Sequence, residues 1–114
     1  MHELSIMQST LELVLQHAAR NQATKVHRIV LKIGAIAGVD PESLRFAHEV
    51  VVSGTIAEAS ILEIIPVPLR CRCRDCSLDF EAEPGPIALC PRCAKPSGEI
   101  LQGREMELSQ LELS

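Results

Sequence analysis

Two pairs of cysteines constrain the fold of this chain more than any other feature of its sequence. The stretches "CRDC" (Cys73, Cys76) and "CPRC" (Cys90, Cys93) are Cys-x-x-Cys knuckles separated by thirteen residues. Each knuckle directs two thiolates at one point, and two knuckles complete the tetrahedral set that structural zinc prefers. Four protein thiolates leave no open coordination position, so the spacing predicts a structural Zn(II) site rather than a catalytic one.

The fifth cysteine, Cys71, lies two residues before Cys73. It is an alternative to Cys73 as the first ligand, but one intervening residue makes a poorer knuckle than two, which favours a packing role or a spare thiol. Five basic residues surround the knuckles, and we expect them to neutralise the metal–thiolate centre rather than to bind phosphate. They are Arg70, Arg72, Arg74, Arg92 and Lys95.

Composition excludes several classes of partner. A chain of 114 residues has room for one compact domain and a small appendage. Aromatic residues make up 2% of the chain and its net charge is −4, which argues against binding nucleic acid. No apolar run reaches the roughly 18 residues of a membrane span, and no basic segment precedes an apolar block at the start. We therefore expect a cytoplasmic protein without a membrane partner, in which an odd number of cysteines does not form a disulfide framework.

The hydrophobic pattern predicts two helix–strand units before the cysteines. Residues 4–21 have apolar positions at helical spacing, and residues 26–33 are rich in β-branched residues with strand alternation. Asp40 and Pro41 form a helix-start signal, as N-cap and first helical residue, for a helix over 41–53. A second strand is predicted over 60–67, ending at the prolines 66 and 68.

After the cysteines, residues 106–113 suggest a last strand that returns to the main sheet. Its alternation changes phase between Leu108 and Leu111, which permits a bulge or an early strand end. The predicted fold is α+β: a small mixed β-sheet with two helices, plus an inserted zinc-ribbon-like module. We expect the first domain to comprise residues 1–69 with 100–114, and the zinc module to comprise residues 70–99.

The first residues, "MHEL", form a ligand set of their own. The α-amine of Met1, the His2 amide nitrogen and the His2 imidazole Nδ1 can close two fused chelate rings around one ion. Such a planar nitrogen set suits Ni(II) or Cu(II), with Glu3 or a backbone group completing the plane. The alternative is a frayed terminus in which Glu3 only complements the helix dipole.

Segment lengths favour the first interpretation. A helix of about 18 residues and a strand of about nine residues each span roughly 27 to 30 Å. If they pack antiparallel, the 34–40 loop returns to the amino terminus and brings Asp40 near His2, as an additional ligand or a partner of one. The histidines His17, His27 and His48 have no neighbour at ligand spacing, so we expect packing or surface roles for them.

The whole chain resembles the HypA/HybF family of hydrogenase nickel-incorporation proteins. The similar stretches are "MHELSI", "VDPESLRFAHEVV", "CRDC", "CPRC" and "GREMELSQLEL". On this resemblance His2 and Glu3 occupy nickel-site positions, and Asp40 an acidic position associated with them. The implied zinc ligands are Cys73, Cys76, Cys90 and Cys93, whereas Cys71 departs from the four-cysteine pattern.

The resemblance implies a nickel metallochaperone that is not an enzyme. It would bind Ni(II) transiently at its amino terminus, work with a maturation GTPase, and deliver nickel to the large subunit of [NiFe]-hydrogenase. Family members occur as monomers and dimers, so a homodimer stays open. The competing hypothesis is a zinc-ribbon module that recognises protein or nucleic acid and has no nickel role. A hydrolytic enzyme ranks last because the sequence has no three-ligand zinc site and no nucleophile paired with a base.

Overall fold

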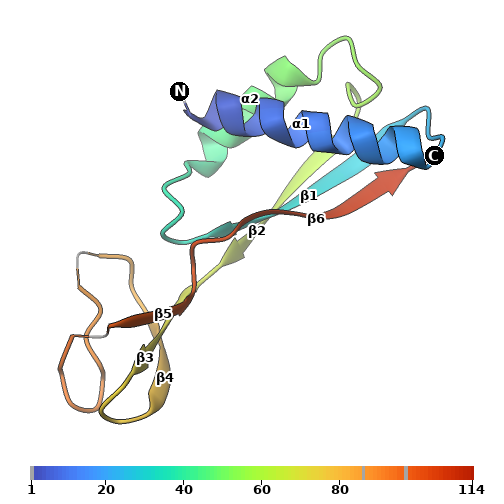
Figure 1. The fold of residues 1–114 in the computed structure, drawn as a ribbon. Coiled ribbons are helices and arrows are strands. Elements are labelled where there is room, and N and C mark those ends of the chain that lie inside the picture. Colours follow the sequence, from blue (N-terminus) through green and yellow to red (C-terminus); the bar gives the residue numbers. More distant parts are fainter. Residues whose placement is uncertain (1, 86, 97) are drawn as a thin grey trace. The chain divides into compact units, whose positions relative to one another are not determined.

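The computed structural model describes residues 2–85, 87–96 and 98–114. It contains two helices and two three-stranded sheets (Figure 1), so the predicted α+β class is confirmed. The chain divides into two compact units. Unit 1 comprises residues 1–31, 39–65 and 107–114, and unit 2 comprises 32–38 and 66–106. The functional division into 1–69 with 100–114 and 70–99 stays a prediction.

Helix α1 (His2–Arg20) begins two residues earlier than its hydrophobic pattern indicated. Its buried stripe recurs every three or four residues, as an amphipathic helix packed on a sheet requires. The stripe includes Met7, Leu11, Val14 and Ala18. The helix ends where Gln22 adopts a left-handed conformation (φ 54°) and the Ala23 N–H donates to the carbonyl of Ala18 at 2.8 Å.

No helix of the described residues is long and apolar enough to cross a membrane.

The sheet of unit 1 has the order β2-β1-β6. Strand β1 (Val26–Gly34) is central, between β2 (Ile61–Val67) and β6 (Met106–Leu113). β1 and β2 run in the same direction in Figure 1, as a strand–helix–strand crossover requires, and β6 runs the opposite way. The predicted alternation of β1 is only partly right: Val30 is buried in addition to Ile29 and Leu31, whereas His27 is exposed. Successive strand residues point to opposite faces of the sheet, so the burial of Val30 between Ile29 and Leu31 shows that both faces are shielded there.

Helix α2 (Pro41–Val51) joins β1 to β2 and packs beside α1. Its start is as predicted: Asp40 is the N-cap, with the Ser43 N–H donating to its carboxylate at 3.1 Å. Leu44 and Ala47 are buried, and a cross-strand ion pair links the strand before this helix to the strand after it. In that pair Arg28 of β1 contacts Glu63 of β2 at 2.6 Å.

Unit 2 is built on the antiparallel sheet β4-β3-β5. Its strands are β3 (Leu69–Cys73), β4 (Leu78–Ala82) and β5 (Glu99–Gln102). The core is small, and three of its five buried residues are cysteines. These five are Leu69, Cys71, Cys73, Phe80 and Cys90. A core of this size is marginal on its own, so a metal ion is the expected additional source of stability.

Within unit 2 the backbone passes very close to itself at Gly34. A Cβ added there would lie 2.0 Å from the Gly103 carbonyl oxygen, which already accepts the Ile36 N–H at 2.9 Å. Gly103 itself has a φ of 125°. Only glycine at position 34 allows this approach.

We therefore expect Gly34→Ala to lower the free energy of unfolding by at least about 2 kcal/mol, because backbone must move to remove the clash. Urea unfolding followed by circular dichroism measures the loss. Gly85→Ala is the matched control, since no described heavy atom lies within 4 Å of its added Cβ. Equal unfolding midpoints for the two variants would contradict the close approach.

Candidate metal centres

The four knuckle cysteines converge at one end of unit 2. Cys73 ends β3, Cys76 lies in the turn to β4, and Cys90 and Cys93 lie in the loop between β4 and β5. Their sulfur atoms all lie within 4.8 Å of one another. The Cys73–Cys93 pair is 3.7 Å apart. The structure therefore brings together the four residues that the spacing singled out, and it forms a site that can hold a metal ion.

The sulfur spacing fits one tetrahedral ion. Four thiolates at the usual Zn–S distance of about 2.3 Å have sulfur–sulfur separations of about 3.8 Å, close to the 3.7 Å between Cys73 and Cys93. A disulfide would need about 2.05 Å. The arrangement thus suits coordination by all four sulfurs, which leaves no position for a substrate.

The thiols of this cluster cannot all ionise without a cation. Backbone N–H groups of Cys93 and Arg92 lower the pKa of Cys90 to about 7, and the Arg92 N–H lies 3.4 Å from the Cys90 sulfur. The neighbouring sulfur of Cys93, followed by burial, raises the pKa of Cys76 to about 12. Four sulfurs at this spacing repel one another once ionised, so a divalent cation would be strongly favoured there.

Each knuckle ends in a strained turn that the sequence did not reveal. Ser77 follows Cys76 with φ 52°, and Ala94 follows Cys93 with φ 61°. The second turn is closed by two backbone bonds, from Ala94 to the Cys90 carbonyl at 2.8 Å and from Cys90 to the Lys95 carbonyl at 2.9 Å. Left-handed non-glycine residues cost on the order of 1 kcal/mol or more and persist where the surroundings enforce them. Here they bend the chain so that both sulfurs of a knuckle face one point.

The basic residues near the cysteines differ in their roles. Arg72 alternates with Cys71 and Cys73 on β3, so its side chain leaves the opposite face of the sheet, where it contacts Asp79 at 3.7 Å. Neutralisation of the thiolates by Arg72 stays a prediction. Lys95 contacts Asp75 at 3.0 Å, and Asp75 followed by Cys93 raises the pKa of Lys95. Lys95 therefore lies close enough to the cluster for its charge to interact with the cysteines.

Cys71 stands apart from the four-cysteine group. It is 1% exposed, belongs to the core of unit 2, and its Cα is paired with that of Phe80 across the β3–β4 ladder. A buried thiol with an aromatic cross-strand neighbour is a packing residue. This agrees with the role that its sequence spacing favoured.

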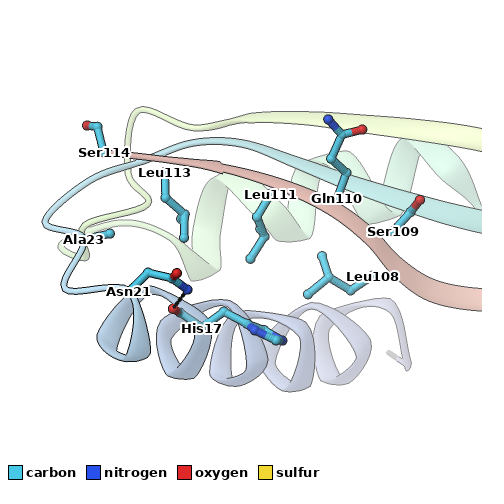
Figure 2. A pocket seen from close by; sticks show the side chains of 9 residues that line it. All are labelled: His17, Asn21, Ala23, Leu108, Ser109, Gln110, Leu111, Leu113 and Ser114. Atoms are coloured by element: carbon cyan, nitrogen blue, oxygen red, sulfur yellow. Dashed lines mark hydrogen bonds between the residues drawn. The ribbon is translucent and has the colours of Figure 1, made fainter.

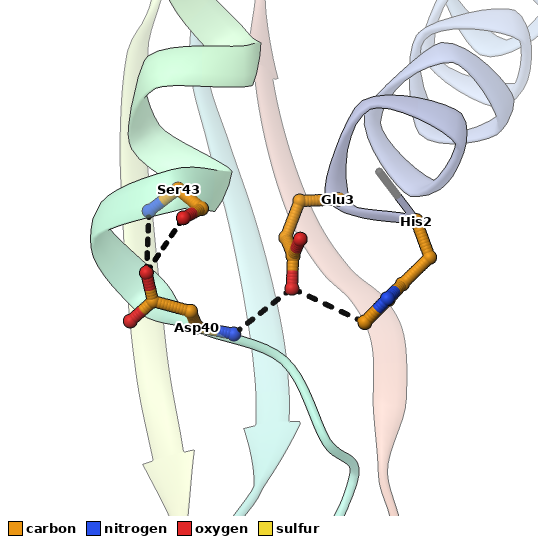
Figure 3. A network of polar contacts seen from close by, with 4 residues as sticks. All are labelled: His2, Glu3, Asp40 and Ser43. Carbon is orange, nitrogen blue, oxygen red and sulfur yellow. Dashed lines mark hydrogen bonds and ion pairs between the residues drawn. The ribbon is translucent and has the colours of Figure 1, made fainter.

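The second candidate centre lies at the start of α1. The His2 Nε2 lies 3.1 Å from the Glu3 Oε2, and the same oxygen accepts the backbone N–H of Asp40 at 3.2 Å (Figure 3). The His2 side chain is 63% exposed and that of Glu3 only 11%. The Asp40 N–H is the largest cause of a lowered pKa of Glu3. The predicted approach of Asp40 to the start of the first helix is confirmed.

Asp40 contributes its backbone rather than its carboxylate to this contact. The carboxylate accepts from the Ser43 N–H at 3.1 Å and from the Ser43 hydroxyl at 2.6 Å, and it points away from His2 in Figure 3. The Ser43 hydroxyl holds the pKa of Asp40 below its usual value. Met1 lies outside the described residues. Ligation of nickel by Met1, His2, Glu3 or Asp40 stays a prediction.

The other histidines have separate partners. His48 is buried on α2, its Nε2 lies 2.9 Å from the Ser60 hydroxyl, and burial lowers its pKa. The exposed His27 Nε2 lies 2.7 Å from the Ser114 hydroxyl. Among the described residues, the four cysteines form the group of three or more side chains that could hold a metal. The predicted packing role of His48 fits its position.

Comparison with known proteins agrees with this arrangement. The model of the family described as "Hydrogenase/urease nickel incorporation, metallochaperone, hypA" matches residues 1–113. The hydrogenase maturation factor HypA of Picosynechococcus sp. is 43% identical over 99% of both chains. That of Aquifex aeolicus is 38% identical over 99% of this chain and 97% of its own.

Solved structures extend the similarity to the fold. The Ni metallochaperone HypA from Helicobacter pylori is 31% identical with a TM-score of 0.69, covering 97% of this chain and 96% of its own. Another solution structure, of a HypA protein, has a TM-score of 0.72 at 31% identity, covering 100% of this chain and 97% of its own. The resemblance noted from the terminal "MHELSI" and the paired knuckles is therefore confirmed, and this chain belongs to the HypA family of hydrogenase nickel-incorporation metallochaperones.

Proposed function

We propose that this chain binds Ni(II) through its amino terminus and delivers it during maturation of [NiFe]-hydrogenase, while the four cysteines hold a structural Zn(II). The observation that carries the proposal is the contact between the exposed His2 imidazole and the Glu3 carboxylate, 3.1 Å apart. Metal-binding histidines commonly donate their second ring N–H to a carboxylate, which sets the tautomer. Donation from Nε2 to Glu3 would set the tautomer in which Nδ1 carries the lone pair that a nickel ligand needs.

The start of α1 supplies the other donors. The first four N–H groups of a helix have no acceptor within the helix, and α1 begins at His2. The amide nitrogen of His2 therefore lies outside the hydrogen-bond ladder of the helix, as the proposed chelate requires. With the α-amine of Met1 and Nδ1 it makes the planar nitrogen set that suits Ni(II).

A site of this kind suits transfer of cargo. Its ligands come from the exposed end of one helix, and the imidazole loses its affinity for metal when it takes up a proton. The proposed zinc site differs in its exposure, because four thiolates from two knuckles would enclose the ion. There Cys73, Cys76, Cys90 and Cys93 would hold Zn(II), which supplies folding energy to the small core of unit 2.

The family relationship motivates the rest of the proposal. A maturation GTPase and the hydrogenase large subunit are the proposed partners, the cytoplasm is the proposed location, and no catalytic turnover is proposed. The net charge of −4 and the contact of Arg72 with Asp79 weigh against the alternative of a nucleic-acid-binding module.

The first test is metal stoichiometry in three proteins: the native chain, His2→Ala, and a chain with several residues other than histidine added before Met1. We expect both changes to abolish tight nickel binding, because His2→Ala removes the imidazole and the extension turns the Met1 amine into an amide far from the new terminus, while zinc stays near one equivalent. Equilibrium dialysis with elemental analysis measures both metals. His17→Ala, on the same helix, is the control that should keep nickel, and Cys90→Ser should lose zinc. Equal nickel in all variants would overturn the amino-terminal site.

A second test isolates the role of Glu3. Glu3→Gln keeps an oxygen that can accept the Asp40 N–H at the position where Glu3 now accepts it at 3.2 Å, so the fold should survive. It removes the negative charge beside His2, which should weaken nickel binding by about 10- to 100-fold. Isothermal titration with Ni(II) measures the change. Glu12→Gln, on the same helix, should leave the affinity unchanged, and an equal effect of both variants would reject the Glu3–His2 contact as a determinant.

The two metals should also differ in their dependence on pH. Imidazole ligands become protonated between about pH 8 and pH 5, so bound nickel should fall as the pH is lowered from about 7.5 to about 5.5. Because the Asp40 N–H holds the pKa of Glu3 below its usual 4.5, Glu3 stays ionised in this range and the loss reports the imidazole. Zinc should be retained over the same interval. Parallel loss of both metals, followed by elemental analysis after dialysis, would contradict the division of roles.

A further inference from the structure

Strand β6 forms one edge of the sheet of unit 1. In the order β2-β1-β6, its neighbour is β1, and the two are antiparallel. Ser114 and Lys25 exchange backbone hydrogen bonds, at 3.0 Å from the Ser114 N–H and 3.2 Å from the Lys25 N–H. Because backbone groups alternate in direction along an antiparallel strand, those of Leu113 and Leu111 point away from β1. The last part of β6 thus offers donors and acceptors at the edge of the sheet.

The apolar side chains of β6 point toward α1. Figure 2 shows Leu108, Leu111 and Leu113 directed at the helix, whereas Ser109 and Gln110 point away from it. Two successive residues on one side are what a β-bulge produces, which agrees with the phase change predicted for this strand. All five residues line a cleft of about 520 Å³ between β6 and the end of α1. The three leucines are only partly buried, so this part of the core is incompletely covered.

Helix α1 extends this apolar surface beyond the edge of the sheet. His17 lines the same cleft, and Leu13 lies one turn earlier on the same side of the helix, where it is 47% exposed. A further strand beside β6 would direct alternate side chains toward these two residues and toward Leu111 and Leu113. The sheet therefore has a place for one more strand.

The charge around this edge indicates which kind of strand can pair with it. Unit 1 contains nine acidic residues and four basic ones. β6 carries Glu107 and Glu112 and no lysine or arginine. Glu112 contacts Arg28 of β1 at 3.0 Å, so Glu107 is the β6 carboxylate that no ion pair among the described residues engages. Pairing of two β6 strands would add acidic residues to acidic ones, which disfavours a second copy of the chain. A strand with lysine or arginine on its outward side would gain cross-strand ion pairs instead.

We propose that the β6 edge is a docking site for an extended segment of another protein, with apolar residues at alternate positions and basic residues between them. The segment adds to the sheet as a fourth strand through the backbone of Leu111 and Leu113. Its apolar residues fill the cleft beside His17 and Leu13. Main-chain bonds supply affinity and the cleft supplies selectivity. The site uses no proposed nickel or zinc ligand, so it holds or fails independently of the proposed function.

The test uses the native chain, loaded with zinc, and the peptide acetyl-Lys-Val-Lys-Val-Lys-Val-Lys-amide as probe. Titration is followed by amide NMR and by hydrogen exchange. We expect shifts at Leu108, Leu111 and Leu113, and amide exchange at Leu111 and Leu113 slowed at least about tenfold at saturation. The same peptide with N-methylated valines, which cannot donate main-chain bonds, should cause neither effect. Absence of binding at millimolar peptide, or equal binding of the methylated peptide, would overturn the proposal.

Two matched variants locate the site. Leu13→Ser changes a side chain that is 47% exposed and should weaken peptide binding by about three- to tenfold. Leu89→Ser changes a side chain of unit 2 that is 55% exposed and should leave binding unchanged. Equal effects, or shifts confined to residues outside β6 and α1, would contradict docking at this edge. Concentration-dependent protection of Leu111 and Leu113 without peptide would assign the edge to a second copy and overturn the proposal too.

Discussion

The hydrogen bond from the Asp40 backbone to the Glu3 carboxylate joins the start of the first helix to the start of the second. Its 3.2 Å length depends on α1, with 19 residues, and β1, with nine, covering similar distances in opposite directions. A change of one turn in α1 would move His2 and Glu3 by about 5.4 Å relative to the 34–40 loop. The largely buried Glu3, and the histidine beside it, are therefore positioned by the lengths of the elements that follow them.

The chain combines two candidate metal centres with contrasting chemistry. The four cysteines converge from two separate knuckles, are held by strained turns at Ser77 and Ala94, and carry sulfurs whose pKa values move in opposite directions. Such a cluster suits an ion that stays. The amino-terminal set lies on the exposed end of one helix, where the Glu3 carboxylate accepts the Asp40 N–H and the His2 side chain is 63% exposed. Such a set suits an ion that leaves.

Most of the fold was predictable because its elements have strong local signals. The Asp40–Pro41 helix start, the β-branched residues of β1 and the spacing of the knuckles each act over a few residues. Predictions were weaker where a side chain has two possible partners. Arg72 is near the cysteines in sequence but lies on the other face of β3, and the Asp40 carboxylate is engaged by Ser43 rather than turned to His2.

The sequence by itself indicated which residues are candidate metal ligands, because ligand chemistry and knuckle spacing are local properties of the chain. It also indicated the order of the helices and strands of unit 1 and the family to which the chain belongs, but not the strands β3, β4 and β5 of unit 2. Only the tertiary structure decided that Cys71 packs against Phe80 outside the four-cysteine group, that the Asp40 N–H rather than its carboxylate meets Glu3, and that β6 turns its leucines toward α1. Each of these contacts joins groups from different segments of the chain, so it forms only when the strands and helices pack together.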